Sequence, residues 1–202
     1  MPDLDLAVTR LFYLGDHHFS GNGGILFPVL RQAFQIFFYL TCAVTLVGLV
    51  VAARNAKPWL FVAVCLITGP LVVTNIGFKD HWGRARPRDV VEFAGAKAFS
   101  PPFPPAEQCD YNCSFVCGEA SSIYLVMFAA ALLFRSRSRK FVALGILFGS
   151  LAGLTRIAQG GHFLSDVVFA GVLMAITAAI IRLMFETLEA ERVRPIEQQG
   201  AT

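Results

Sequence analysis

Two stretches of sequence without a charged residue decide the fold: AFQIFFYLTCAVTLVGLVVAA, from Ala33 to Ala53, and PWLFVAVCLITGPLVVTNIGF, from Pro58 to Phe78. Each is 21 residues long. An α-helix needs about 20 apolar residues to cross the roughly 30 Å hydrocarbon core of a bilayer. We therefore predict that both stretches are transmembrane helices.

The composition of the whole chain also indicates a membrane protein. Of its 202 residues, 17 are Lys or Arg, 14 are Asp or Glu, and 55% are hydrophobic. Soluble domains contain about 25% charged residues, whereas this chain contains 15%. This shortage disfavours a secreted enzyme, a disordered regulator and a nucleic-acid-binding module, and the net charge of +3 is too small to indicate nucleic-acid binding. We expect one membrane domain over residues 1–202.

Three further apolar stretches have uncharged interiors and charged residues near their ends. They run from Ser114 to Phe134, from Phe141 to Ala158 and from His162 to Phe185. The sequence thus predicts an all-α integral membrane protein with about five transmembrane helices and a cytoplasmic tail at 186–202. The predicted spans are residues 33–53, 58–78, 114–134, 141–158 and 162–185.

Basic residues in the loops predict the orientation of these helices, because cytoplasmic loops are enriched in Lys and Arg. The N-terminus, the segment from Lys79 to Cys113 and the turn Gln159–Gly161 are then external. The part from Arg88 to Cys113 exceeds the usual length of an unstructured connection, which favours a lid or a packed cap. The residues assigned to the cytoplasmic side are Arg54, Lys57, Arg135, Arg137, Arg139, Lys140, Arg192 and Arg194.

The N-terminal residues are too few to span a membrane before the first apolar stretch. Apolar side chains occur there at helical spacing, which predicts an amphipathic helix lying on the external membrane surface. A plain N-terminal tail is the alternative. We assign residues 1–30 to this interfacial segment. The apolar residues in question are Leu4, Ala7, Val8, Leu11 and Phe12.

Charged residues that a membrane helix seldom tolerates gather at the predicted external helix ends. Arginine matches phosphate oxygens bidentately and lysine adds a point charge. Gly118 and its neighbour Cys117, at the start of the third helix, would bring backbone N–H groups to the same anion. Any one of these cations alone is more simply explained as a snorkelling anchor, but together they predict an anion site. The gathered residues are four cations, a histidine and two carboxylates: Lys79, Arg84, Arg86, Arg156, His162, Glu119 and Asp166.

His162 and Asp166 are four residues apart, which places them on one face of a helix that begins near His162. A carboxylate in that position can keep one imidazole nitrogen protonated and leave the other free as a nucleophile or base. An ordinary polar contact is the alternative interpretation.

Two groups of these residues match the signatures of a known family. Lys79, Arg86 and Pro87 fit Lys-x6-Arg-Pro. Arg156, His162 and Asp166 fit Ser-Arg-x5-His-x3-Asp. Thr155 stands at the position of the serine in this signature. Over roughly residues 58 to 185 the chain resembles the type-2 phosphatidic acid phosphatase family.

This resemblance implies a helical membrane fold and dephosphorylation without a metal or another cofactor. It further implies that His162 attacks phosphorus to give a phosphohistidine and that Asp166 orients His162. The cations would stabilise the charge of the transferred phosphoryl group. Those cations are Lys79, Arg84, Arg86 and Arg156.

The middle signature of the family departs from the usual pattern. Relatives have Pro-Ser-Gly-His, whereas this chain reads Val116-Cys117-Gly118-Glu119. The missing histidine normally protonates the leaving oxygen. We expect Glu119 to take this role if burial keeps it protonated. If Glu119 is instead ionised and neutralises an arginine, His81 is the alternative acid.

The stretch CSFVCGEAS, from Cys113 to Ser121, resembles the lipid A 4'-phosphatase branch of the family in Gram-negative bacteria. Cys109 and Cys113 lie on the predicted external side, where oxidising conditions permit a disulfide, although spacing alone leaves its formation open. Cys117 continues their four-residue spacing, but a fourth ligand with recognisable spacing is missing, so we predict no metal site.

The sequence therefore predicts a multi-pass lipid phosphatase of the bacterial inner membrane, hydrolysing a phosphate monoester on a lipid headgroup at the periplasmic face. Its predicted partners are a phosphorylated lipid and the bilayer, and not nucleic acid. Lipid A is the expected substrate; phosphatidylglycerophosphate, phosphatidic acid and undecaprenyl diphosphate are alternatives. An anion transporter or a lipid-binding membrane protein is the rival of another class.

Overall fold

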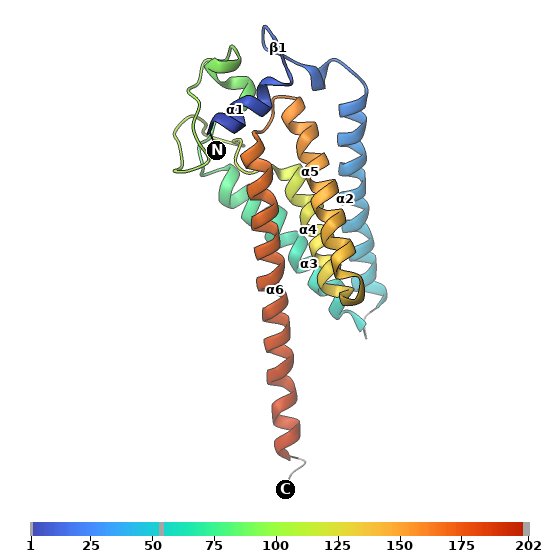
Figure 1. Ribbon diagram of the computed structural model, residues 1–202. Coiled ribbons are helices and arrows are strands. Elements are labelled where there is room, and N and C mark those ends of the chain that lie inside the picture. The colour runs from blue at the N-terminus through green and yellow to red at the C-terminus, as the bar shows by residue number, and fades with distance from the viewer. Residues whose placement is uncertain (1, 53–54, 200–202) are drawn as a thin grey trace.

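The computed structural model describes residues 2–52 and 55–199, with side chains described as far as residue 191. Five long helical segments form a bundle, and the N-terminal segment and the connection at residues 80–117 cover one end of it (Figure 1). We call this covered end the site end. The helical segments are α2 (Leu26–Val51), α3 (Lys57–Leu66) with its continuation η3 (Ile67–Lys79), α4 (Gly118–Leu133), α5 (Ser138–Ala158) and α6 (Leu164–Gln199).

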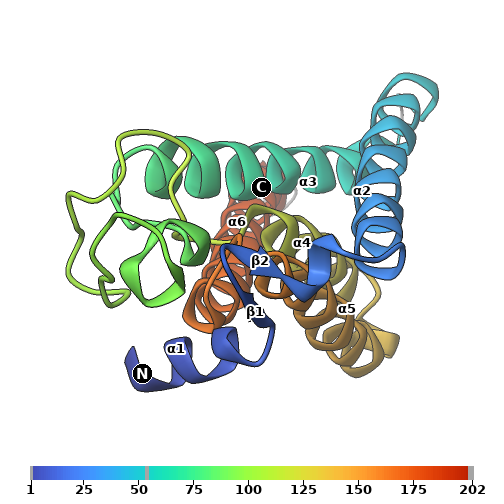
Figure 2. The ribbon, with the colours of Figure 1, turned by 90° about the horizontal axis from the view of Figure 1, so that it is seen from above.

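Among the described residues, four segments are long and apolar enough to cross a membrane, which confirms a multi-pass helical fold. They are Leu26–Val51, Lys57–Lys79, Arg135–Ala158 and Leu164–Glu191. The fifth predicted span, α4, has only 16 residues and is about 24 Å long. It lies among the other helices (Figure 2), so protein rather than lipid surrounds most of its length.

Small residues allow α5 to approach its neighbours closely. A Cβ atom on Gly149 would lie 2.4 Å from the ring of Tyr124 on α4, and one on Gly153 would lie 2.2 Å from Val167 on α6. Glycine at these two positions therefore removes the side chain that would separate the helices, as is common where membrane helices pack.

The second predicted span changes helical type at its middle. After α3 the chain continues as the π-helix η3, which contains Pro70. Proline lacks the backbone N–H and its ring crowds the preceding turn, so a regular α-helix is disrupted here. The Asn75 side chain donates to the Pro70 carbonyl at 2.8 Å. The wider helix ends at Lys79 and brings this side chain to the site end.

The N-terminus contains the predicted helix, α1 (Pro2–Arg10), followed by a hairpin of β1 (Tyr13–Gly15) and β2 (His18–Phe19) and the short helix η1 (Ser20–Asn22). The prediction that α1 merely lies on the membrane surface is incomplete. Asp5 and Thr9 on one face of α1 are buried, and α1 packs against α6. A polar face of α1 thus forms part of the protein interior.

Residues 80–117 form a packed cap rather than an open lid. Their regular elements are the two short helices η4 (Pro87–Asp89) and η5 (Val91–Phe93). Trp82 stacks on Phe115 with ring centroids 5.0 Å apart, and its indole N–H donates to the Pro102 carbonyl at 2.7 Å. These contacts fix the cap over the helix ends that carry the predicted site.

The opposite end of the bundle holds several predicted cytoplasmic residues. Arg135 and Arg182 both pair with Glu186, and Lys57 pairs with Glu189 at 3.1 Å. The predicted tail at 186–202 begins as a continuation of α6, which remains helical to Gln199. Arg54 and the side chains of Arg192 and Arg194 lie outside the described residues.

Candidate active site

The structure brings most of the predicted site residues together at the site end, where four segments meet. These segments are the end of η3, the cap, the start of α4 and the turn between α5 and α6. The side chains gathered there are Lys79, Arg86, Cys117, Glu119, Arg156, His162 and Asp166.

His162 is fully buried, and its Nδ1 atom lies 2.6 Å from the backbone carbonyl oxygen of Ser114. A carbonyl oxygen can only accept, so Nδ1 carries the proton and donates it. Nε2 then holds the free lone pair, and among the described residues it has no hydrogen-bond partner. His162 thus presents an unpaired nitrogen to the site, as a nucleophile requires.

Asp166 is placed differently from the prediction. Helix α6 begins at Leu164, so His162 precedes the helix, and Nδ1 lies 3.6 Å from Asp166 Oδ2, beyond hydrogen-bond distance. Asp166 Oδ2 instead accepts from the Phe163 backbone N–H at 2.8 Å and from Ser114 Oγ at 2.5 Å. Asp166 therefore caps its own helix and holds Ser114, whose carbonyl orients the imidazole.

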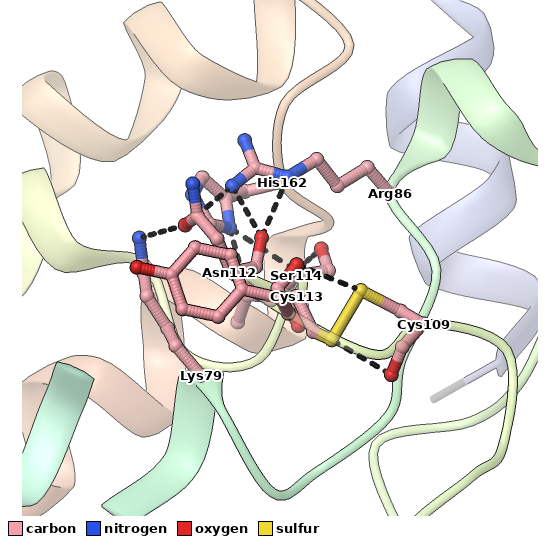
Figure 3. The surroundings of a disulfide bond; sticks show 9 residues. Lys79, Arg86, Cys109, Asn112, Cys113, Ser114 and His162 are labelled. Carbon is pink, nitrogen blue, oxygen red and sulfur yellow. Dashed lines mark hydrogen bonds and ion pairs between the residues drawn. A yellow bond between two sulfur atoms is a disulfide. The ribbon is translucent and has the colours of Figure 1, made fainter. Parts of the chain in front are cut away.

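Lys79 and Arg86 share one partner that sequence reasoning missed. The side-chain oxygen of Asn112 accepts from Lys79 Nζ at 3.4 Å and from Arg86 Nη2 at 2.9 Å (Figure 3). Its backbone carbonyl accepts from the same Nη2 at 2.7 Å. Asn112 lies in the loop closed by the disulfide between Cys109 and Cys113. This loop holds both cations in place before any anion arrives.

Arg156 approaches the site from the end of α5. Its Nη1 donates to Gln159 at 2.5 Å, and its Nε lies 3.1 Å from Glu119 Oε1. A Cβ on Gly161 would lie 2.8 Å from Arg156 Nη2. Glycine in the predicted turn Gln159–Gly161 therefore makes room for the guanidinium.

Arg84 does not reach the site, and the prediction that it binds phosphate needs correction. Its side chain is completely buried, and Nη1 donates to Asp166 Oδ1 at 2.5 Å. Nη2 donates to Asp5 at 2.8 Å, and Nε donates to the Ser100 carbonyl at 2.9 Å. With its donors directed at these oxygens, Arg84 holds the protein together behind His162.

Glu119 is an ion-pair partner rather than the protonated acid that we expected in the free protein. Its Oε1 lies 3.1 Å from Arg156 and 3.2 Å from Arg31 on α2, a cation that the sequence analysis did not single out. Two arginines stabilise the ionised carboxylate. His81, the alternative acid, has an exposed side chain.

The Cys117 backbone N–H donates to the Asp166 backbone carbonyl at 3.2 Å, so it does not serve the anion as predicted. The N–H groups of the first turn of α4, from Gly118 onward, lie beside the same space. The Cβ position of Gly118 is 3.2 Å from Lys79 Nζ, so glycine leaves the lysine room beside the helix terminus. Cys117, Glu119 and His162 bring three possible metal-ligand atoms within 4.8 Å of one another. However, burial raises the pKa of the Cys117 thiol to about 12, and the surrounding Lys79 and Arg156 favour an anion over a cation.

Burial also lowers the pKa of His162 to about 4, with only partial opposition from Asp166. We predict that His162 remains neutral at all pH values above about 4, so its lone pair is available at neutral pH. A titration of ¹⁵N-histidine-labelled protein by NMR, with His162→Gln to assign the signal, should give this midpoint and the Nδ1–H tautomer. A midpoint near 6.5, the value of a solvated histidine, would contradict the prediction.

Comparison with known proteins identifies the family. A family model described as the PAP2 superfamily matches residues 58–190, which include Lys79, Arg86, Glu119, His162 and Asp166. The chain belongs to the PAP2 superfamily. The family assignment made from the two signatures is thereby confirmed.

Three curated relatives that match this PAP2 protein in sequence carry the name Lipid A 4'-phosphatase. The protein from Francisella tularensis subsp. novicida is 40% identical over 199 residues, covering 93% of this chain and 89% of the relative. The protein from Rhizobium leguminosarum is 28% identical and covers 95% of this chain and 91% of the relative. No solved structure matches the chain. The family match and the similarity to these relatives indicate that this PAP2 protein is a phosphatase acting on a phosphate monoester, as the sequence predicted.

Proposed function

We propose that this PAP2 protein removes the 4'-phosphate of lipid A at the periplasmic face of the bacterial inner membrane, through a phosphohistidine on His162. One observation carries the mechanism: the Nε2 atom of a fully buried His162 has no hydrogen-bond partner among the described residues and lies in a site lined by cations. The names and the extended similarity of the relatives support lipid A as the substrate.

In the proposed first step His162 Nε2 attacks phosphorus, the bond between phosphorus and the 4'-oxygen of lipid A breaks, and the dephosphorylated lipid leaves as its alcohol. Lys79, Arg86 and Arg156 bind the phosphoryl oxygens, and the start of α4 adds backbone N–H groups. As Nε2 bonds to phosphorus, the imidazole becomes positive. The Ser114 carbonyl, 2.6 Å from Nδ1, and the nearby Asp166 carboxylate stabilise that charge. Water then attacks phosphorus, the Nε2–phosphorus bond breaks, and inorganic phosphate leaves neutral His162 behind.

Glu119 is our proposed proton donor for the leaving oxygen, although it is ion-paired before substrate binds. Its carboxylate lies within 4.8 Å of the ligand atoms of His162 and Cys117, and Glu119 also lines the cavity beside the site. A phosphate that binds Arg156 competes with Glu119 for this cation. The proton can arrive with the substrate, since phosphate monoesters have a second pKa of about 6.

A cavity beside the site suggests how a lipid substrate enters. It has a volume of about 270 Å³ and lies between α2, η3 and α4. Its inner end is formed by Lys79, Gly118 and Glu119, and its rim includes Tyr39, which is 66% exposed on the predicted lipid-facing surface. A lipid could therefore present its phosphate from the side, with its acyl chains in the bilayer.

Orientation toward the periplasm has two physical supports. Arg135, Arg137, Arg139 and Lys140 lie at the bundle end opposite the site, as expected for a cytoplasmic end under the positive-inside rule. The disulfide between Cys109 and Cys113 lies at the site end, and disulfides persist in the oxidising periplasm.

The function is tested by incubating the purified protein in detergent and EDTA with lipid A that carries phosphate at both the 1- and 4'-positions. We expect release of inorganic phosphate and, by tandem mass spectrometry of the lipid, loss of the 4'-phosphate alone. Loss of the 1-phosphate, or hydrolysis only of phosphatidylglycerophosphate or phosphatidic acid offered in parallel, would contradict the proposed substrate. Activity that requires an added metal would contradict the mechanism.

Replacement of Glu119 tests its role as the acid. Glu119→Gln should reduce turnover of the lipid by about 10²-fold, because general acid catalysis contributes that much, while p-nitrophenyl phosphate, whose leaving group needs no proton, should be hydrolysed nearly normally. Exposed Glu107→Gln is the matched control. An equal loss on both substrates would show instead that Glu119 acts by holding Arg156.

A further inference from the structure

Asp5 of α1 is an unusual residue for an N-terminal amphipathic helix, because its carboxylate is buried behind the site. It is 1% exposed. Asp5 Oδ1 accepts from the backbone N–H of Ser165 at 2.7 Å, and Oδ2 accepts from Ser165 Oγ at 2.5 Å. Ser165 lies in the first turn of α6, where backbone N–H groups lack partners within the helix. Asp5 thus caps α6 from a segment 160 residues away in sequence.

Arg84 connects Asp5 to the groups around His162. Its guanidinium donates to Asp5 Oδ2 at 2.8 Å and to Asp166 Oδ1 at 2.5 Å, and it lies over the ring of Phe163, 4.4 Å from the centroid. One buried cation is therefore shared by two buried carboxylates, one from α1 and one from the site.

Both groups that face His162 Nδ1 are held by this one arginine. The side chain of Arg84 holds Asp166, and its backbone carbonyl accepts the Ser114 N–H at 2.8 Å. Asp166 in turn binds Ser114 Oγ at 2.5 Å, and the Ser114 carbonyl binds Nδ1. The orientation of the imidazole is thus linked to Asp5 through an unbroken series of hydrogen bonds between buried atoms.

Stability alone does not account for such an arrangement. Buried ion pairs are often no more stabilising than apolar packing of similar volume, because removing charges from water is costly. They do fix geometry, since each charged group accepts only a narrow set of partner positions. A helix that needed only an anchor could use its apolar residues.

We propose that Asp5 is a positioning residue for catalysis, acting through Arg84 on Asp166 and Ser114 to hold His162 Nε2 in line with the phosphate. The inference rests on the proposed role of His162. It gives α1 a function in the reaction beyond attachment to the membrane surface. Without Asp5, Arg84 loses one of its two carboxylates and the first turn of α6 loses its cap, so the imidazole is no longer fixed.

Asp5→Asn tests the proposal, with the exposed Asp3→Asn on the same helix as the matched control. Displacement of a reacting group by about 1 Å can reduce the rate by about 10²-fold, so we expect kcat to fall by about 10- to 100-fold. KM should change by less than about twofold, because the phosphate-binding cations are untouched. Asp5→Glu, which keeps the charge, should recover part of kcat, and the NMR signal of His162 Nδ1–H should shift in Asp5→Asn but not in Asp3→Asn.

A wild-type kcat in a folded Asp5→Asn variant would overturn the proposal, and so would a lower melting temperature with kcat unchanged. Binding of inorganic phosphate shows whether the variant is folded. If Asp5→Asn does not fold, Ser165→Ala keeps every charge and removes the hydroxyl that donates to Asp5 Oδ2 at 2.5 Å and accepts from Arg84 Nη1 at 2.8 Å. An unchanged kcat in that variant would equally contradict us. The wild-type protein in the same assay distinguishes failure of the Asp5 proposal from failure of the proposed function. If the wild-type protein itself releases no phosphate, it is the proposed function that is wrong.

Discussion

Replacing His162 with glutamine should abolish phosphate release from the lipid, with a loss on the order of 10⁴-fold or more, as expected when a nucleophile is removed. Glutamine can still donate to the Ser114 carbonyl, which His162 contacts at 2.6 Å, so the surroundings should remain folded. Its amide nitrogen has no free lone pair with which to attack phosphorus.

The assay for this variant is release of inorganic phosphate by protein purified in detergent, with binding of inorganic phosphate as a test of folding. His18→Gln in the exposed part of the N-terminal hairpin is the matched control and should retain full activity. Turnover by His162→Gln within tenfold of wild type would exclude His162 as the nucleophile.

Replacing Arg86 with methionine should have the second largest effect, a loss of about 10²- to 10³-fold in kcat/KM. Removal of one group that stabilises transition-state charge typically costs this much. Arg86 is 9% exposed, and Asn112 holds its guanidinium at 2.7 and 2.9 Å. The cation is thus already in place when the phosphate arrives and needs no reorganisation.

Arg86→Lys distinguishes charge from geometry, because lysine keeps the positive charge without the planar fork that binds two oxygens at once. We expect it to recover only part of the lost activity. The matched control is Arg88→Met, since the Arg88 side chain is 50% exposed and pairs with Asp89 at the surface. A loss in Arg88→Met as large as in Arg86→Met would show that general positive charge, rather than the bound guanidinium, is what matters.

The sequence predicted the helical bundle well because bilayer thickness sets the length of an apolar helix. It was less accurate at the helix ends. The first long helix begins at Leu26, seven residues before the predicted start at Ala33, and so includes Arg31. A charged residue can lie in such a helix when it has a partner, here Glu119 on α4, and hydropathy along one segment does not reveal a partner on another.

Residues that the structure brings together at the site end were singled out from the sequence where they lie in signatures with fixed spacing. Lys79, Arg86, Arg156 and His162 were found in this way. Asn112 and Ser114 were missed as site residues. Ser114 holds His162 through a backbone carbonyl, which any residue type supplies, and Asn112 adds its side-chain oxygen from a loop outside the recognised signatures. Their position depends on the path of the cap, which has no periodic pattern to interpret.

Arg84 and Arg86 show most clearly what a single sequence cannot predict about the site. They are two residues apart in the same segment and have the same chemistry, yet one is buried between Asp5 and Asp166 and the other faces the site. Asp5, which lies near the start of the chain, is one of the partners of the buried Arg84. A single sequence gives no sign of a contact across 79 residues.

Trapping the covalent intermediate tests the central claim most directly. Lipid A labelled with ³²P at the 4'-position is mixed with the protein and quenched in alkali within milliseconds, and the labelled peptide is identified by mass spectrometry. We predict an acid-labile, alkali-stable phosphoryl group on His162, absent from His162→Gln. Full turnover without a labelled protein species, or a label on another residue, would contradict the account.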